Sequence, residues 1–166
     1  MKYFLDTEFI EYPNTIELIS VALVHEDGKS IYAENADCDY TKAGEWVNRN
    51  VIPNLLFKDG NRNFEKAPDN SLKIKAPLKA IESLILGFIG CDKPIFYGYY
   101  SAYDWVVFCW IFGSMVELPK GWPMYCRDLK QLADGLNKPR FEGPKNKHNA
   151  LTDARWNKEF YEYLIS

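Results

Sequence analysis

Three segments near the start of the chain have the residue pattern of β-strands. Residues 2–10, 15–26 and 29–36 are rich in aromatic and β-branched residues, and an Asp27-Gly28 pair separates the second segment from the third. Such runs are typical of strands in a buried sheet, and Asp-Gly between two of them favours a hairpin turn. The pattern therefore predicts three consecutive strands that pair as antiparallel neighbours.

Helical and extended segments alternate in the rest of the chain. Apolar spacing predicts helices at residues 41–52, 77–90, 101–113, 129–136 and 150–166. Shorter runs predict strands at residues 93–100 and 123–129. Residues 57–76 begin with a polar stretch rich in Asn, Asp and Gly, so we expect a loop there.

Together these elements predict an α/β fold in which a five-stranded mixed sheet is flanked by helices. Three strands followed by alternating helix and strand are compatible with the ribonuclease H-like fold. The 166 residues contain no internal repeat and no evident boundary, so we expect one domain over residues 1–166.

The composition argues against membrane proteins, secreted proteins and proteins that coat long duplexes. No apolar stretch reaches the roughly 18 residues of a membrane span, and the N-terminus lacks the basic and apolar regions of a signal peptide. Four cysteines without a CxxC pair argue against a zinc site and predict a reducing, cytoplasmic location. The net charge of −3 speaks against a protein that coats long duplexes, but not against a nuclease that grips a few nucleotides.

Two carboxylates interrupt the first predicted strand. Asp6 and Glu8 stand between Leu5 and Phe9, where the pattern calls for buried residues. Because side chains alternate along a strand, Asp6 and Glu8 point to the same face, and like charges this close repel each other. A positive group between them would explain the pair, although both could also lie at a solvated strand end.

Three further polar residues stand at helix starts or in a loop. Asp104 begins the helix predicted at 101–113, and Asp153 follows His148 by five residues at the start of the last helix. Each has an ordinary explanation: an acid in a first helical turn meets the positive end of the helix dipole, and a loop histidine is usually solvated. The other histidine, His25, is interpreted as a surface residue of the second strand.

In combination these residues resemble the DEDDh 3'-to-5' exonucleases, the group of RNase T, oligoribonuclease and proofreading subunits. The three motifs of that group stand here as Asp6 with Glu8, as Asp104, and as His148 with Asp153. The stretches "YFLDTEFIE", "AGEWV", "VIPNL", "SAYDWV" and "HNALTDAR" are similar to the polyadenylate-specific 3'-exoribonucleases of the RNase AS type. Tyr99 and Tyr100 stand where many members carry an Asn or a His-Asn pair before the second motif, so a substrate contact of that Asn is not carried over.

The resemblance implies a two-metal mechanism with two Mg²⁺ ions, for which Mn²⁺ can substitute. Four acids without a cysteine suit these hard cations. We expect Asp6 to bridge both ions, Glu8 and Asp153 to complete the first site, and Asp104 to hold the second through water. His148 is expected to be the general base for the attacking water, since imidazole titrates near neutral pH.

The expected substrate is the 3' end of single-stranded RNA, with a preference for adenylate that the resemblance implies. Phe9 and Tyr103 are candidates to contact the substrate, and Glu17 is a candidate acceptor for an adenine amino group; the alternatives are a core phenylalanine and an ordinary strand-end acid. A basic loop could meet the phosphates or be merely solvated; its cations are Lys138, Arg140, Lys145 and Lys147.

Three other interpretations stay open from the sequence. The enzyme could act on DNA 3' ends, it could be a ribonuclease H-like endonuclease, or the chain could be a non-catalytic nucleic-acid binding module. The last is disfavoured because all five motif residues are present. Related enzymes are often homodimers, so we also expect a homodimer.

Overall fold

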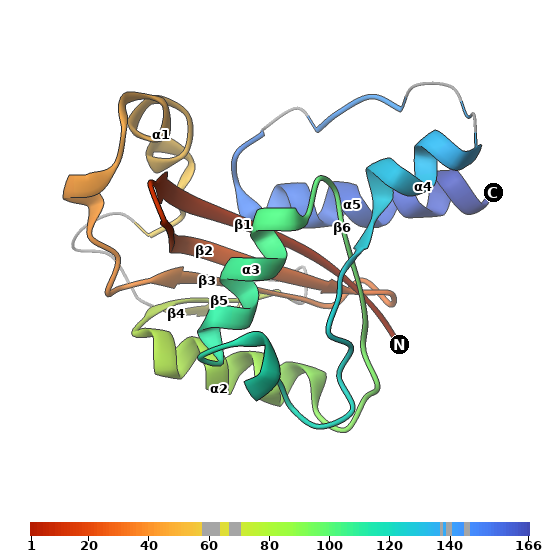
Figure 1. The fold of residues 1–166 in the computed structure, drawn as a ribbon, viewed down its shortest axis with the longest axis horizontal. Helices are drawn as coiled ribbons and strands as arrows, with labels where there is room; N and C mark the ends of the chain where they lie inside the picture. The colour runs from red at the N-terminus through yellow and green to blue at the C-terminus, as the bar shows by residue number, and fades with distance from the viewer. Residues whose placement is uncertain (58–63, 67–70, 137, 139–140, 145–146) are drawn as a thin grey trace.

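A computed structural model describes residues 1–57, 64–66, 71–136, 138, 141–144 and 147–166. Its centre is a seven-stranded mixed sheet in the order β4-β5-β3-β2-β1-β6-β7 (Figure 1). The strands are β1 (Lys2–Tyr12), β2 (Thr15–His25), β3 (Ser30–Asn35), β4 (Phe64–Lys66), β5 (Ser71–Ala76), β6 (Ile95–Gly98) and β7 (Arg127–Asp128).

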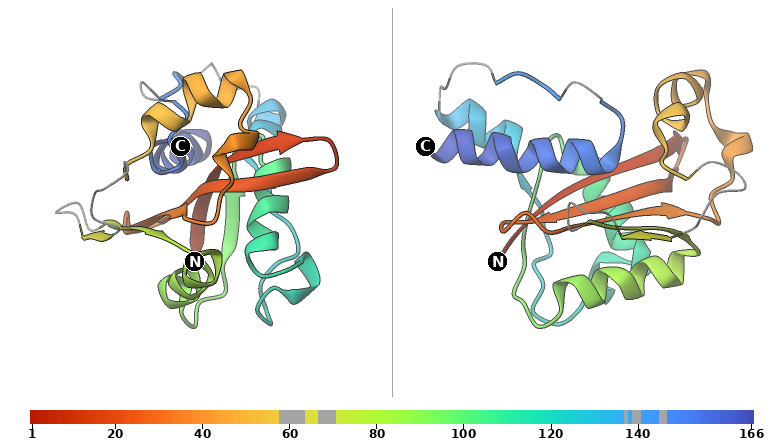
Figure 2. Two further views of the ribbon diagram at one scale, coloured as in Figure 1. Left: turned by 90° about the vertical axis from the view of Figure 1, so that its left-hand side faces the viewer. Right: turned by 180° about the vertical axis from the view of Figure 1, so that it is seen from behind.

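The helices lie on both faces of this sheet (Figure 2). They are η1 (Tyr40–Lys42), α1 (Glu45–Asn50), η2 (Ile52–Asn54), α2 (Leu78–Ile89), α3 (Ala102–Ile111), η3 (Met115–Glu117), α4 (Leu129–Leu136) and α5 (Ala150–Ile165). Helices α2 and α3 cover one face, and α5 covers the other (Figures 1 and 2). The predicted α/β architecture with flanking helices is confirmed.

The sheet contains the three antiparallel strands that the sequence predicts. β1 pairs with β2 and β2 pairs with β3, both antiparallel, while β6 runs parallel to β1. The register of β1 with β2 shifts between Glu8 and Phe9, which marks a bulge directly after the second acid of the strand. The predicted mixed sheet is present as β3-β2-β1-β6-β7, in agreement with a ribonuclease H-like fold.

The predicted strand count is wrong, because the sheet has seven strands within the described residues and not five. Within the supposed loop 57–76, β5 pairs parallel with β3, and β4 pairs antiparallel with β5. Leu72 and Ile74 alternate with Lys73 and Lys75 in β5, a strand period that the preceding Asn, Asp and Gly residues obscured. Residues 58–63 and 67–70 of this stretch lie outside the described residues.

The helix predicted at 41–52 is divided into three short pieces, η1, α1 and η2. Gly44 is the N-cap residue of α1, and Pro53 lies within η2, where it cannot continue an α-helix ladder. The strand predicted at 123–129 is reduced to Arg127–Asp128. The remaining predicted helices agree with α2, α3, α4 and α5 to within two residues at each end.

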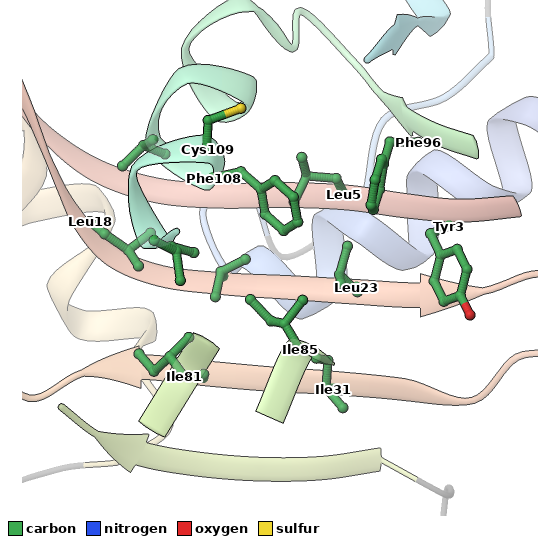
Figure 3. Packing of buried hydrophobic residues seen from close by; sticks show 14 of the residues in the cluster. Tyr3, Leu5, Leu18, Leu23, Ile31, Ile81, Ile85, Phe96, Phe108 and Cys109 are labelled. Carbon is green, nitrogen blue, oxygen red and sulfur yellow. The ribbon is translucent and has the colours of Figure 1, made fainter. Parts of the chain in front are cut away.

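Two apolar clusters, one on each face of the sheet, show in which direction the side chains in the first half of β1 point. Leu5 packs with Leu23, Ile85 and Phe108 beneath α2 and α3, as Figure 3 shows. Phe4, the neighbour of Leu5, belongs instead to the cluster beneath α5. Asp6 and Glu8 alternate in phase with Phe4, so they point to the α5 face.

Within the described residues, no helix is both long and apolar enough to cross a membrane.

Candidate active site

Asp6, Glu8 and Asp153 form a compact cluster of carboxylates. Asp6 and Glu8 come from β1, and Asp153 comes from the first turn of α5. One carboxylate oxygen from each lies within 4.8 Å of the others. Asp6 and Glu8 thus point to the same face of the sheet, as expected, and Asp153 of α5 meets them there.

Two asparagines fix α5 over β1. Asn157 is buried, and its Nδ2 donates a hydrogen bond of 2.9 Å to the carbonyl oxygen of Leu5, the residue before Asp6. Asn149 is the N-cap residue of α5, where its side chain accepts a hydrogen bond from the N–H of Thr152. These bonds fix the first turn of α5, and with it Asp153, relative to Asp6 of β1.

Asp104 approaches from the other face of the sheet, at the start of α3. Its Oδ1 accepts two hydrogen bonds from Thr7, one of 2.9 Å from the N–H and one of 2.6 Å from Oγ1. Thr7 lies between Asp6 and Glu8 and points to the opposite face. Asp104 is outside the three-acid cluster, but it lies close enough to raise the pKa of both Asp6 and Glu8.

Burial and mutual repulsion disfavour the charged forms of these acids. Burial, and then the charges of Asp153 and Asp104, raise the pKa of Glu8 to about 8. The pKa of Asp6 is raised well above its ordinary value by burial and then by the three other acids. Burial raises the pKa of Asp104 to about 6 against the opposing hydrogen bonds from Thr7.

Asp153 also has a raised pKa, and burial is the main cause. The N–H groups of His148 and Asn149, which both donate to its Oδ2, act in the opposite direction. Among the residues that the structure describes, no lysine or arginine forms an ion pair with any of the four acids. A donor set made only of carboxylate oxygens fits hard divalent cations such as Mg²⁺ or Mn²⁺.

His148 lies beside the acids in the loop before α5. Its backbone is in the left-handed region with φ 66°, and its N–H donates a 2.8 Å hydrogen bond to Oδ2 of Asp153. Its ring meets the ring of Trp46 edge-on, with 4.8 Å between the centroids. The sequence-predicted set of Asp6, Glu8, His148 and Asp153 is therefore gathered at one place, with Asp104 next to it.

A pocket of about 580 Å³ extends from this site along α4 and α5. Asp6, His148 and Asp153 line one part of it. Its other lining residues include four aromatic rings and three lysines: Tyr99, Phe141, Trp156, Phe160, Lys130, Lys138 and Lys147. Two of the four predicted basic-loop cations, Lys138 and Lys147, thus border the pocket. Arg140 and Lys145 lie outside the described residues.

The three predicted substrate-contact residues lie apart from the pocket lining. The rings of Phe9 and Tyr103 contact each other at 5.9 Å between centroids, on the α3 side of β1. Glu17 accepts hydrogen bonds from the N–H of Asp39 and the hydroxyl of Tyr12. Substrate contacts of these residues stay predictions.

The sequence analysis missed the residues that hold the acids in place. Thr7 has a usable signal, because a hydroxyl between two strand acids must face the opposite helix. Asn157 stands four residues after Asp153, one helical turn further along the same face of α5. Asp128, which accepts hydrogen bonds from the N–H groups of Ser101 and Lys130, gives no comparable signal.

Known proteins similar to this chain include 3'-5' exoribonucleases. Two curated relatives, the 3'-5' exoribonucleases Rv2179c and MT2234.1 of Mycobacterium tuberculosis strains H37Rv and CDC 1551, are each 36% identical over 157 residues, which covers 93% of this chain and 88% of theirs. Among solved structures, the catalytic unit of Neurospora crassa Pan2 (protease and nuclease domain) matches with a TM-score of 0.44 and 18% identity, over 97% of this chain and 26% of that one.

A family description also matches nearly the whole chain. It is the 3'-5' exoribonuclease Rv2179c-like domain, and it covers residues 1–165. The prediction of a 3'-5' exoribonuclease is thereby confirmed at the level of the family. The chain belongs to the Rv2179c-like 3'-5' exoribonuclease family.

Proposed function

We propose that this protein is a metal-dependent 3'-to-5' exoribonuclease of the DEDDh group that releases nucleoside 5'-monophosphates from single-stranded RNA. The observation that carries the proposal is the cluster of Asp6, Glu8 and Asp153, with oxygens within 4.8 Å of one another and with His148 beside it. Repulsion among these acids makes the cluster unfavourable without a positive group, so its arrangement is best explained by cation binding.

The proposed cofactor is a pair of Mg²⁺ ions, for which Mn²⁺ can substitute. Asp6, Glu8 and Asp153 would hold them directly, and Asp104, whose Oδ1 is engaged by Thr7, would contribute through water. When bound, such ions neutralise the phosphoryl oxygens, activate water and stabilise the leaving alkoxide.

His148 is the proposed general base. It accepts a proton from the water that attacks the last phosphodiester bond, since a neutral imidazole nitrogen is a good acceptor near neutral pH. Its N–H bond to Asp153 fixes the loop relative to the acid cluster, so the base and the acids keep one geometry.

The pocket along α4 and α5 is the proposed path of the RNA upstream of the scissile bond. Lys138 and Lys147 supply positive charge for phosphates, and Tyr99 and Trp156 supply aromatic surface for bases. On the α3 side of β1, Phe9 and Tyr103 are the proposed contacts of the terminal nucleotide, and Glu17 that of an adenine amino group. A preference for adenylate, as in the RNase AS type, belongs to this proposal.

The test is the release of 5'-AMP from oligo(A) RNA, followed by chromatography with Mg²⁺, with Mn²⁺ and with EDTA. We expect AMP as the product in both metals and none in EDTA. Products that keep a 3'-phosphate, or equal release in EDTA, would overturn the proposal.

Substrate choice is tested with matched oligomers. Oligo(A), oligo(U) and oligo(C) RNA of equal length, together with oligo(dA), are compared by kcat/KM. The proposal predicts the fastest release from oligo(A) and slow release from DNA, since only RNA offers the 2'-hydroxyl. Equal kcat/KM values for the three RNAs would refute the adenylate preference but not the exoribonuclease activity.

A homodimer through the outer face of α3 is also part of the proposal. Val106 and Trp110 are 36% and 41% exposed, and they form a stripe along a helix whose only charged residue, Asp104, is buried. Such a stripe can pack against its own copy about a two-fold axis. Sedimentation velocity is expected to give a dimer, and Trp110→Glu a monomer; a monomeric wild-type protein would contradict it.

A further inference from the structure

The stretch "VIPNL", residues 51–55, has no role in the function proposed above. In the structure it contains η2, and its last helical residue, Asn54, lies next to the His148 loop although more than 90 positions separate them in sequence. This proximity indicates that the stretch contributes to the structure of the His148 loop, which the sequence alone does not show.

Asn54 is bonded to both sequence neighbours of His148. Its Nδ2 donates a hydrogen bond of 3.2 Å to the carbonyl oxygen of Lys147. Its own carbonyl oxygen accepts a hydrogen bond of 2.8 Å from Nδ2 of Asn149. The peptide of His148 is therefore held between two bonds to a single residue.

The conformation of His148 requires such support. A left-handed φ of 66° is unfavourable for a residue with a Cβ, and it persists only where the surroundings fix it. One restraint is the N–H bond to Asp153, and another is the edge contact with Trp46 from α1. The two bonds to Asn54 act on the flanking residues Lys147 and Asn149, of which Asn149 also donates its N–H to Asp153.

Asn54 is itself fixed from two sides. Its Nδ2 also donates to the carbonyl oxygen of Asn50 at the end of α1. Directly after it, the N–H groups of Leu56 and Phe57 donate to Oε1 of Glu34, a fully buried residue of β3. The sheet therefore anchors the residue that holds the His148 loop.

We propose that Asn54 is a positioning residue for His148, anchored through the Glu34 contacts of the chain that follows it. The proposal rests on the proposed role of His148 as general base. Within the described residues, Nδ2 of Asn54 bonds to the carbonyl oxygens of Asn50 and Lys147 and not to the acid cluster. A change of this side chain therefore acts on the loop of the base, while the carbonyl oxygen that accepts from Asn149 stays in place.

The experiment compares Asn54→Ala with the control Asn48→Ala. Asn48 is an exposed asparagine of α1 whose Nδ2 likewise donates to two carbonyl oxygens, those of Ala43 and Gly44, but not to the His148 loop. The chain has two histidines, so a ¹H–¹³C spectrum of the metal-free protein has two imidazole Cε1–H signals, with that of His25 as internal reference. The kinetics use oligo(A) RNA, and Mg²⁺ affinity is measured by calorimetry.

In Asn54→Ala we expect the His148 signal to shift or split while the His25 signal stays in place. We expect kcat to fall about 10- to 100-fold, as for other residues that orient a catalytic group, with KM and Mg²⁺ affinity unchanged. Asn48→Ala should match the wild type in all four measurements.

An unchanged His148 signal in Asn54→Ala would overturn the proposed contact. A changed signal with wild-type kcat would overturn its importance for the reaction. Wild-type protein that releases no nucleotide would instead refute the proposed function, while the spectra would still decide whether Asn54 positions His148.

Discussion

At the scale of single residues, the site depends on where one strand places its charges. Alternation along β1 sends Asp6 and Glu8 to the α5 face and sends Thr7 to the α3 face, where it binds Asp104. These three consecutive residues thereby contact acids from two helices on opposite sides of the sheet, Asp153 of α5 and Asp104 of α3. The same alternation made the direction of Asp6 and Glu8 predictable from sequence.

Asp6→Asn removes a charge from the centre of the cluster. We expect Mg²⁺ affinity to be lost and kcat to fall about 10³-fold or more, since metal ions contribute several kcal/mol of transition-state stabilisation. Titration calorimetry and AMP release measure the two effects. Glu11→Gln, an exposed acid of the same strand, is the control, and unchanged Mg²⁺ affinity in Asp6→Asn would contradict the assignment.

His148→Ala separates the base from the metal ligands. We expect kcat to fall about 10²- to 10⁴-fold, the usual contribution of general base catalysis, while Mg²⁺ affinity is retained. Steady-state kinetics with oligo(A) and calorimetry on the same preparation decide this. Near-normal turnover would remove the histidine from the mechanism.

At the scale of elements, the active site depends on how α5 is fastened to β1. Asn157 supplies a buried hydrogen bond to Leu5 one residue before Asp6, and Asn149 caps the same helix. Helix α5 and strand β1 were both predictable from periodicity. The bonds between them were not, because they join residues 152 positions apart, and no local pattern encodes such a pairing.

Asn157→Ala tests this fastening. The carbonyl oxygen of Leu5 loses its buried donor, so we expect the free energy of unfolding to fall by about 1–3 kcal/mol. Urea unfolding of the metal-free protein measures it. Lys158→Ala, which removes a surface ion pair with Glu162 on the same helix, should cost far less, and an equal loss in both variants would argue against the specific bond.

The sequence analysis missed several secondary-structure elements, and their local composition explains why. The strand β5 pairs with β3, and its neighbour β4 completes an edge that the polar composition of residues 57–76 concealed. The pieces η1, α1 and η2 were read as one helix, although Gly44 and Pro53 divide them. This division creates η2 and thereby places Asn54 beside His148.

At the scale of the whole molecule, the acid cluster links metal binding to stability. The pKa of Glu8 is about 8 in the folded protein against an ordinary value of 4.5, so between these pH values the folded state binds more protons than the unfolded state. Stability of the metal-free protein therefore falls as pH rises from about 5 to 8. Asp6 and Asp153, with raised pKa values, act in the same direction.

Divalent cations are expected to reverse this dependence. They bind the deprotonated acids, so the increase in Tm caused by Mn²⁺ should grow between pH 5 and pH 8. Thermal unfolding in EDTA and in Mn²⁺ across this range measures it, and Asp153→Asn should show a smaller increase. A gain in Tm that is the same at all pH values would contradict the linkage.

The fold as a whole was more predictable from sequence than the surroundings of the site. Hydrophobic periodicity depends on local spacing, so it located β1, β2, α3 and α5. The motif acids and His148 were found by their order along the chain. Alternation gives the direction of Thr7, but the hydrogen-bond partners of Thr7, Asn54 and Asn157 are distant in sequence, and only the folded chain brings them within hydrogen-bond distance.

The central claim is metal-dependent removal of nucleotides from the 3' end, and one gel tests it most directly. Single-stranded oligo(A) RNA with a 5' label is incubated with Mg²⁺, with Mn²⁺ and with EDTA and is resolved on a sequencing gel. We predict a ladder that shortens one nucleotide at a time in both metals and an intact band in EDTA. Internal fragments at early times would indicate an endonuclease, and an uncut RNA in every lane would contradict the assignment of an active exoribonuclease.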